Sequence, residues 1–273
     1  SATRSKALDI SRVFLPMATL TNVGIAGDAQ AIELMINKMM VSPLLEDQRV
    51  GRELFENADK EIGSMISRVE TEHGQKFRDF LTESRQAIAA ARTKITGEQL
   101  PLWEHQEKVK PGVRLTFDSP DNLNRVVAAA LFNNNPGPET ETDFLRIVSQ
   151  MGNNQKREIL DEVFKGRTNR RHKPPRAFEK AFYNFEIQSK VGEWRDLQRM
   201  RMNTLERGLL TTEIGFATPR EFYEVMVYGE KLAGIYEKHM EKRDQLHRKI
   251  AANISPEVAQ YVVGFGNYLN WSV

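Results

Sequence analysis

Apolar residues recur every three or four positions through much of the chain, which predicts a helix-rich protein. The clearest helix covers residues 29–40, with Asp28 as its N-cap, and a weaker stripe predicts a second helix from Ser42–Pro43 onward. A third helix is expected over about residues 72–94, so the chain should begin with a helix pair and one longer helix. The apolar face of the first helix consists of Ile32, Met35, Ile36 and Met39.

The later part of the chain continues the helical pattern. Short helices are predicted over residues 122–132, 144–151 and 156–164. Residues 221–254 have apolar positions close to a three-four spacing, which predicts one long amphipathic helix. Ser255 and Pro256 are a typical cap and first-turn pair, and they should open a last helix.

Two segments have the pattern of β-strands. In residues 178–187, FEKAFYNFEI, apolar side chains occupy every second position, and VRLTF at residues 113–117 favours a short strand. The segment Arg12–Ile25 combines apolar and β-branched residues around Pro16, so it should be extended or turning. Helices and strands together predict an α+β fold.

Residues 97–120 form the best candidate for a boundary, because the helical pattern stops there and three prolines and two glycines appear. We therefore divide the chain into residues 1–118 and 119–273. The basic, proline-broken residues 165–176 should form a loop, either solvated or facing a substrate, and they are too short and too poor in aromatic residues to favour a nucleic-acid partner.

The two ends of the chain resemble one another. VAQYVVGFGNYLNW, residues 258–271, is similar to ISRVFLPMATLTNV, residues 10–23, with Asn22 and Asn270 in corresponding places. This faint repeat predicts that the chain spans the second half of one unit and the first half of another. Such a chain is either a fragment of a tandem protein or a permuted single unit.

Composition removes several classes of chemistry. The chain has 273 residues, no cysteine and a formal net charge of +2, so it lacks disulfides, thiolate metal sites and a whole-molecule field that would attract nucleic acid or a membrane. We find no apolar run of about 18 residues and no pattern typical of a signal peptide, and we expect a cytoplasmic protein.

No metal site is expected. His239 and His247 lie two turns apart on a predicted helix, about 12 Å along its axis, which is too far to share a metal ion. We expect both to be surface or interface residues.

The stretch GEWRDLQRMRMNTLERGLL, residues 192–210, is expected to form one helix that carries four arginines. Arg195 and Arg199 would share a helical face, whereas Arg201 would lie on an adjacent one. Guanidinium groups on two faces suit a ligand with several phosphates. Equally, the arginines could lie on a solvated face, with Asp196 paired to Arg199 and Glu206 to its neighbours.

This helix resembles the signature of the flavin-dependent thymidylate synthases, an Arg-His-Arg triplet in the helix after a strand, followed by a serine and then by a further serine and arginine. The triplet here reads Arg199-Met200-Arg201, Thr204 replaces the first serine, and Leu209 and Thr211 stand at the later positions. The loss of the histidine and the late arginine removes groups that would contact ligands.

Two more segments carry the resemblance. FEKAFYNFEI is similar to the family strand that begins with a Glu-His pair, which here is Glu179-Lys180. The N-terminal segment is similar to one that leads into an Asn-Ala-Arg helix start and a later substrate-binding arginine. Those positions are Asp28-Ala29-Gln30 and Met39 in this chain. The resemblance covers the first 60 or so residues and about residues 113–273.

The resemblance implies a fold like that of the thymidylate synthase complementing proteins, helix-rich with a small, mainly antiparallel sheet. Residues 1–118 would be the C-terminal half of one such unit with a helical linker, and residues 119–273 the N-terminal half of a second unit that carries the Arg-x-Arg helix. It also implies a homotetrameric flavoprotein that methylates dUMP to dTMP with FAD, methylenetetrahydrofolate and NADPH.

The resemblance also implies roles for residues around the helix. Arg199 and Arg201 would contact FAD, and the substrate nucleotide would be bound by Arg195, Asp196, Arg199 and Thr204. No catalytic side chain is identified, because in this family the reduced flavin delivers hydride and the protein orients the ligands. The lost cations leave two alternatives, a synthase reduced to FAD or nucleotide binding, and a non-catalytic structural or assembly half of a tandem protein.

Overall fold

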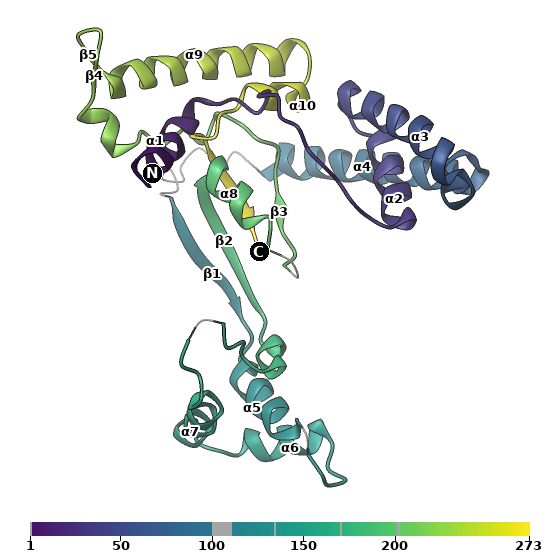
Figure 1. Ribbon diagram of the computed structural model, residues 1–273, viewed down its shortest axis with the longest axis vertical. Helices are drawn as coiled ribbons and strands as arrows, with labels where there is room; N and C mark the ends of the chain where they lie inside the picture. The colour runs from purple at the N-terminus through teal and green to yellow at the C-terminus, as the bar shows by residue number, and fades with distance from the viewer. Residues whose placement is uncertain (1, 100–110, 134, 170, 201–202) are drawn as a thin grey trace. The chain divides into compact units, whose positions relative to one another are not determined.

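The computed structural model describes residues 2–99, 111–133, 135–169, 171–200 and 203–273 (Figure 1). For residues 95–99 it describes the backbone only. Two compact units share the chain. Unit 1 consists of Ser1–Lys110, Lys190–Arg199 and Gly208–Leu269, and unit 2 of Pro111–Ser189, Met200–Arg207 and Asn270–Val273. The division into residues 1–118 and 119–273 as halves of repeated units remains a prediction.

Three predicted helices of unit 1 are confirmed as α2 (Ala29–Met40), α3 (Leu45–Ile66) and α4 (Glu72–Gln99) (Figure 1). Asp28 caps α2, because its carboxylate accepts a hydrogen bond from the Ala31 N–H at 2.8 Å. The second helix was predicted to start at Ser42–Pro43, but α3 begins at Leu45. The Ser42 hydroxyl instead donates a hydrogen bond to the Asp47 carboxylate at 2.6 Å. The core between α2 and α3 consists of Ile36, Phe55 and Ile66, together with Val69 of η2 (Ser67–Glu70).

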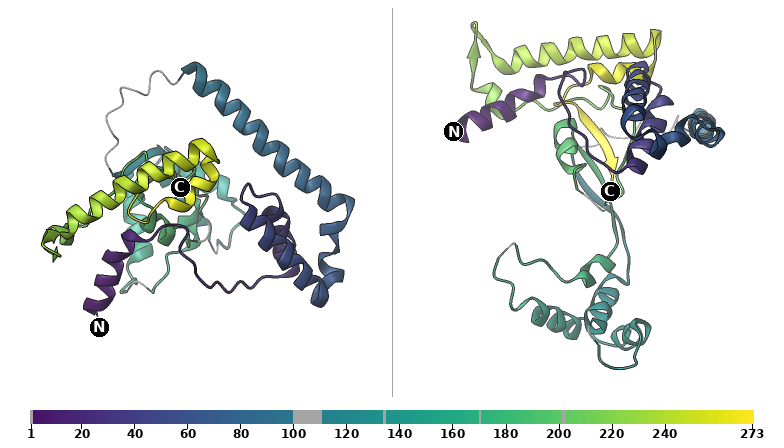
Figure 2. Two further views of the ribbon diagram at one scale, coloured as in Figure 1. Left: turned by 90° about the horizontal axis from the view of Figure 1, so that it is seen from above. Right: turned by 45° about the vertical axis from the view of Figure 1, so that its right-hand side comes forward.

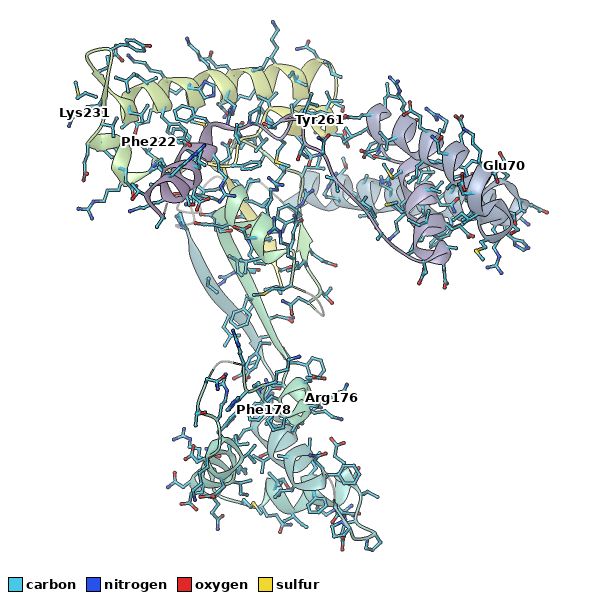
Figure 3. All side chains as sticks on the ribbon, in the orientation of Figure 1. Glu70, Arg176, Phe178, Phe222, Lys231 and Tyr261 are labelled. Atoms are coloured by element: carbon cyan, nitrogen blue, oxygen red, sulfur yellow. The ribbon has the colours of Figure 1, made fainter. Side chains whose placement is uncertain are left out.

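The other part of unit 1 is built around α9 (Leu232–Asn253). Figure 2 shows this helix from two further directions, with α10 (Pro256–Ala259) and η6 (Gln260–Val262) beside it. Phe222, labelled in Figure 3, belongs to its apolar core. The remaining buried core residues are Val13, Ala233, Tyr236 and Met240.

The prediction of one helix over residues 221–254 was wrong at its start. Its first residues instead form η5 (Arg220–Tyr223) and a hairpin of β4 (Met226–Val227) and β5 (Glu230–Lys231). The hairpin turns at Tyr228 and Gly229, which both have positive φ, and two such residues favour a tight turn over a helix.

The N-terminal segment begins with α1 (Ala2–Ser11) and η1 (Arg12–Phe14). The prediction of an extended or turning segment over Arg12–Ile25 was therefore wrong for its first three residues, whereas the residues from Leu15 to Ile25 form no helix. Pro16 forms an isolated antiparallel bridge with Gly264. The two segments that resemble one another in sequence therefore lie side by side within unit 1.

Unit 2 carries most of a four-stranded sheet of order β1-β2-β6-β3. Its pairs β1–β2 and β3–β6 are antiparallel, which together with the helices confirms the α+β class with a small antiparallel sheet. The strands are β1 (Gly112–Asp118), β2 (Tyr183–Lys190), β3 (Glu206–Arg207) and β6 (Tyr268–Ser272).

The predicted strand at residues 178–187 is only half correct. Residues Arg176–Lys180 form η4, and β2 begins at Tyr183. The side-chain amide of Asn122 bonds both backbone groups of Phe182, at 2.8 Å to the N–H and 2.7 Å to the carbonyl, and so fixes the chain just before the strand. Alternation of apolar residues in sequence cannot reveal this distant contact.

Three predicted helices of unit 2 are confirmed as α5 (Asn122–Phe132), α6 (Glu141–Ser149) and α7 (Asn153–Phe164). Val127, Ala128 and Val148 form their buried core. Among the described residues of both units, no helix has the length and apolar character needed to cross a membrane.

Candidate functional site

The expected arginine-bearing helix is much shorter than predicted. α8 runs only from Val191 to Leu197, and the chain then turns and becomes extended (Figure 1). At the beginning of the helix, the Gly192 N–H bonds the Phe265 carbonyl at 3.0 Å. Farther on, residues 206–207 form β3 against β6, so pairing with a strand distant in sequence replaces the helix that local spacing favours.

Arg195 is the predicted site residue with the most defined environment. It lies on α8, half-buried, and its guanidinium carbon is 4.6 Å from the centroid of the Phe265 ring. This is a cation–π contact, and the guanidinium N–H groups make no hydrogen bond with a described residue. Arg195 makes no ion pair with any described residue.

Asp196 and Arg199 are both exposed, and the structure does not pair their side chains. The one contact between them joins the Arg199 N–H to the Asp196 carbonyl at 3.4 Å, as part of the turn that ends α8. Because α8 ends at Leu197, Arg199 does not share a helical face with Arg195. The salt-bridge interpretation of Asp196 with Arg199 was therefore wrong.

An ion pair is present on the other side of the same helix. Glu193 bonds the Lys190 N–H at 3.0 Å and pairs with the Lys190 ammonium group, also at 3.0 Å. The acidic residue close to Arg195 in sequence thus stabilises the start of α8. Within the described part of unit 1, no carboxylate forms an ion pair with Arg195 or Arg199.

The remaining residues of the motif fall into three groups. Arg201 lies outside the described residues. Met200 and Thr204 are exposed residues of unit 2, and Met200 is 57% exposed. Leu209 and Thr211 belong to unit 1, where Leu209 is exposed and Thr211 half-buried. Only Arg195, Asp196 and Arg199 of the predicted set are therefore brought together within one unit.

The two upstream segments have structural partners of their own. Glu179 and Lys180 belong to η4, and the Lys180 ammonium group pairs with Glu141 at 3.2 Å. Met39 lies where α2 crosses α3 closely, since a methyl group added at Gly51 would come within 2.8 Å of its Cβ. Asp28 acts as the cap of α2. None of these contacts identifies a ligand.

The expectation that both histidines are surface or interface residues was wrong for His247, which is 6% exposed. His239 is exposed, and its Nε2 lies 3.0 Å from Nη2 of the buried Arg243. Partial burial and the charges of Arg243 and Lys242 lower the pKa of His239. In the described part of the chain, no group of three or more histidine, aspartate and glutamate side chains could hold a metal ion.

Two features of unit 1 were missed by sequence reasoning. Phe265, the ring beneath Arg195, comes from the C-terminal repeat segment, and the only sequence signal for it is that repeat. A hollow of about 570 Å³ also lies among α2, α3 and the start of α4. Its charged lining residues are Arg52, Arg78, Glu56, Glu70 and Asp79, a net negative set that does not suit a phosphate.

No protein-family model matches the chain. It is similar to the UPF0159 protein of Chlamydia muridarum, at 34% identity over 271 residues, which are 98% of this chain and 48% of that protein. UPF0159 proteins of Chlamydia pneumoniae and Thermoplasma acidophilum are 32% and 28% identical over 98% and 97% of this chain, and 48% and 49% of their own lengths. The chain thus spans about half the length of the curated relatives it matches.

Proposed function

We propose that the chain is part of a divergent protein of the flavin-dependent thymidylate synthase type, with a fold like that of the thymidylate synthase complementing proteins, and that α8 and the turn after it bind FAD or a nucleotide phosphate. The observation that carries this proposal is the state of Arg195. Its guanidinium group is held against Phe265 at 4.6 Å and is not neutralised by a described carboxylate. A positioned cation with free N–H groups is suited to phosphate oxygens.

Arg199 adds a second cation four residues later, with no described ion pair. The two guanidinium groups would bind phosphate oxygens of the cofactor or the substrate, and Asp196 would bind a hydroxyl or base group of a dUMP-like nucleotide. Arg201 would contact FAD, as the resemblance implies. When bound, FAD would supply the hydride chemistry, with methylenetetrahydrofolate and NADPH as co-substrates in an active homo-oligomer.

In this proposal, Met200 is expected to weaken catalysis more than ligand binding. A thioether offers no strong hydrogen-bond donor, so the position that holds a histidine in the family cannot donate to a flavin or to an anionic base. Arg195 and Arg199 would still provide attraction to phosphate. We therefore propose that ligand binding is retained more fully than catalysis.

The alternative function is that of a non-catalytic half that supports assembly of a tandem protein. The length of the relatives favours a tandem arrangement, because each is about twice as long as the matched region. The replaced motif positions, Met39, Met200 and Thr211, favour loss of catalysis in this half. Both functions are compatible with the α+β fold.

The flavin absorption spectrum of the purified chain tests the proposal. A yellow protein, or a colourless one that binds added FAD, supports cofactor binding, whereas a protein that ignores added FAD refutes it and favours the assembly function. Tritium release from labelled dUMP in the presence of NADPH and methylenetetrahydrofolate then separates an active synthase from a binding protein.

Substitution of Arg199 locates the cofactor site. Loss of a charge-assisted hydrogen bond corresponds to about 1.5–3 kcal/mol, so Arg199→Ala should weaken FAD binding by roughly 10- to 100-fold. Arg207→Ala should weaken it less, because Arg207 lies outside the Arg-x-Arg triplet, and Arg220→Ala is a matched control for loss of one exposed positive charge in unit 1. Equal effects of the three substitutions would contradict this placement.

A further inference from the structure

The repeat segments of unit 1 are related by a local two-fold arrangement of the backbone. Residue numbers in the two segments differ by 248, as Pro16 and Gly264 do. With this offset the short helix η1 (Arg12–Phe14) corresponds residue by residue to η6 (Gln260–Val262). Pro16 and Gly264, which correspond under this offset, are themselves the two residues of the antiparallel bridge. The similarity of the two sequences is therefore reproduced in local structure.

Two hydrogen bonds across this crossing obey the same relation, whereas a third, from the Ala18 N–H to the Tyr261 carbonyl at 3.0 Å, has no counterpart among the described residues. The Met17 N–H bonds the Val263 carbonyl at 2.8 Å, and the Phe265 N–H bonds the Leu15 carbonyl at 3.0 Å. With the offset of 248 residues, Met17 corresponds to Phe265 and Leu15 to Val263. The two hydrogen bonds are therefore equivalent, with the donor and acceptor segments swapped. The two segments thus share these two hydrogen bonds at the crossing.

Beyond the crossing the two segments differ sharply. The C-terminal segment becomes β6 and fills the position between β2 and β3, with Leu269 and Trp271 buried at 1% and 5% exposure. We call this position the β2–β3 slot. In the N-terminal segment, the corresponding residues 20–25 belong to no helix or strand. Thr21 and Val23, the counterparts of Leu269 and Trp271, are both exposed, and Leu20 is 92% exposed.

The backbone of residues 20–25 is also unpaired. Within the described part of the chain, none of their N–H or carbonyl groups makes a backbone hydrogen bond. Extended backbone with unsatisfied groups and exposed apolar side chains is a template for pairing with another strand. Residues 20–25 therefore correspond to β6 in the repeat but have no strand partner.

The hydrogen bonds of β6 indicate which groups a strand needs in order to pair in the β2–β3 slot. The Gln188 amide donates to Oδ1 of Asn270 at 2.8 Å, and Phe185 exchanges both backbone hydrogen bonds with Val273, at 2.8 and 3.0 Å. The N-terminal segment retains an asparagine, Asn22, at the position of Asn270, and a β-branched residue, Ile25, at that of Val273. Its pairing groups are thus preserved.

We propose that residues 20–25 form the middle strand of a second sheet, inserted into a β2–β3 slot of a partner module built like unit 2. The partner module that would receive this strand is the half of the UPF0159 relatives that lies outside the region matched by this chain. The described residues contain one β2–β3 slot, and β6 already fills it, so a second copy of this chain has no vacant slot to offer. Relatives of about twice the length have room for a second module.

A photocrosslink in the intact C. muridarum relative tests this proposal, since both parts are present there. The photoreactive residue p-benzoylphenylalanine replaces the residue that aligns with Val23, and the control carries it at the position that aligns with Leu45, which is 78% exposed in α3 of this chain. We expect the Val23 position, and not the Leu45 position, to crosslink to the half that this chain does not match. A crosslink within the matched half, a crosslink to a second molecule, or no crosslink would each overturn the proposal.

A thermal measurement provides a second test. Val23→Lys should leave the melting temperature of the 273-residue chain unchanged, because the side chain is exposed, whereas the equivalent substitution in the intact relative should lower it by about 2–4 °C or more. Equal melting behaviour in both proteins would refute strand insertion. Neither test depends on flavin, so its failure is distinguishable from failure of the proposed function.

Discussion

Gly264 at the centre of the crossing should be intolerant of even one added methyl group. A Cβ at this position would lie 1.6 Å from Nη1 and 2.8 Å from Cζ of Arg243. Arg243 is only 6% exposed, and its Nη2 donates to the Phe14 carbonyl at 2.7 Å, so the guanidinium group holds η1 against α9. Gly264→Ala must displace this group.

The expected cost follows from the bond that is lost. A hydrogen bond from a charged donor contributes about 1.5–3 kcal/mol, so Gly264→Ala should lower the free energy of unfolding by about 2 kcal/mol. For a chain of this size, 1 kcal/mol corresponds to about 2–4 °C, and the melting temperature should fall by about 4–8 °C.

Thermal unfolding of matched variants measures this effect. The control is Gly24→Ala, since a methyl group there meets no atom within 4 Å and should leave the stability unchanged or slightly raised. Gly264→Ala should also cost less in an Arg243→Met background, where no guanidinium group has to move. The reasoning is refuted if Gly264→Ala is as stable as the wild-type chain, or if its cost is the same in both backgrounds.

Three further predictions concern side chains of unit 1. The buried Tyr236 hydroxyl has no described hydrogen-bond partner, so Tyr236→Phe should be neutral or raise the melting temperature. The pKa of His239 is lowered in the folded chain, mainly by burial and then by Arg243, so protonation favours unfolding. Stability should therefore fall as the pH drops from about 7 through the unfolded pKa of about 6.5, and a pH series of melting temperatures on His239→Gln should lack this change. Asp28→Ala removes the cap of α2 and should cost about 1 kcal/mol in urea unfolding, whereas an unchanged midpoint would show that the cap is dispensable.

The helices that the sequence predicts correctly are those specified by local patterns. α2 has a capping aspartate and a regular apolar face, and α5 to α7 each carry apolar residues that pack into one core. The wrong predictions depend on residues distant in sequence. α8 ends at Leu197 and the chain farther on forms β3 against β6, and β2 starts late where Asn122 binds Phe182.

The candidate site was predictable only in part for the same reason. The motif placed Arg195, Asp196 and Arg199 near one another, and the structure confirms their proximity in α8 and the following turn. It could not indicate that Phe265 supports Arg195, since the two residues are far apart in sequence. Spacing also favoured an ion pair between Asp196 and Arg199, which the structure does not contain.

The bridge between Pro16 and Gly264 has a consequence for the order of folding. Nearly the whole chain lies between these two residues, so the bridge closes a very long loop and cannot form during synthesis until Gly264 has left the ribosome. The helices α2 and α3, whose contacts are local, can form much earlier. Donor and acceptor dyes on α1 and β6 should therefore report a slow, late rise in energy transfer during refolding, after most helical signal has been recovered.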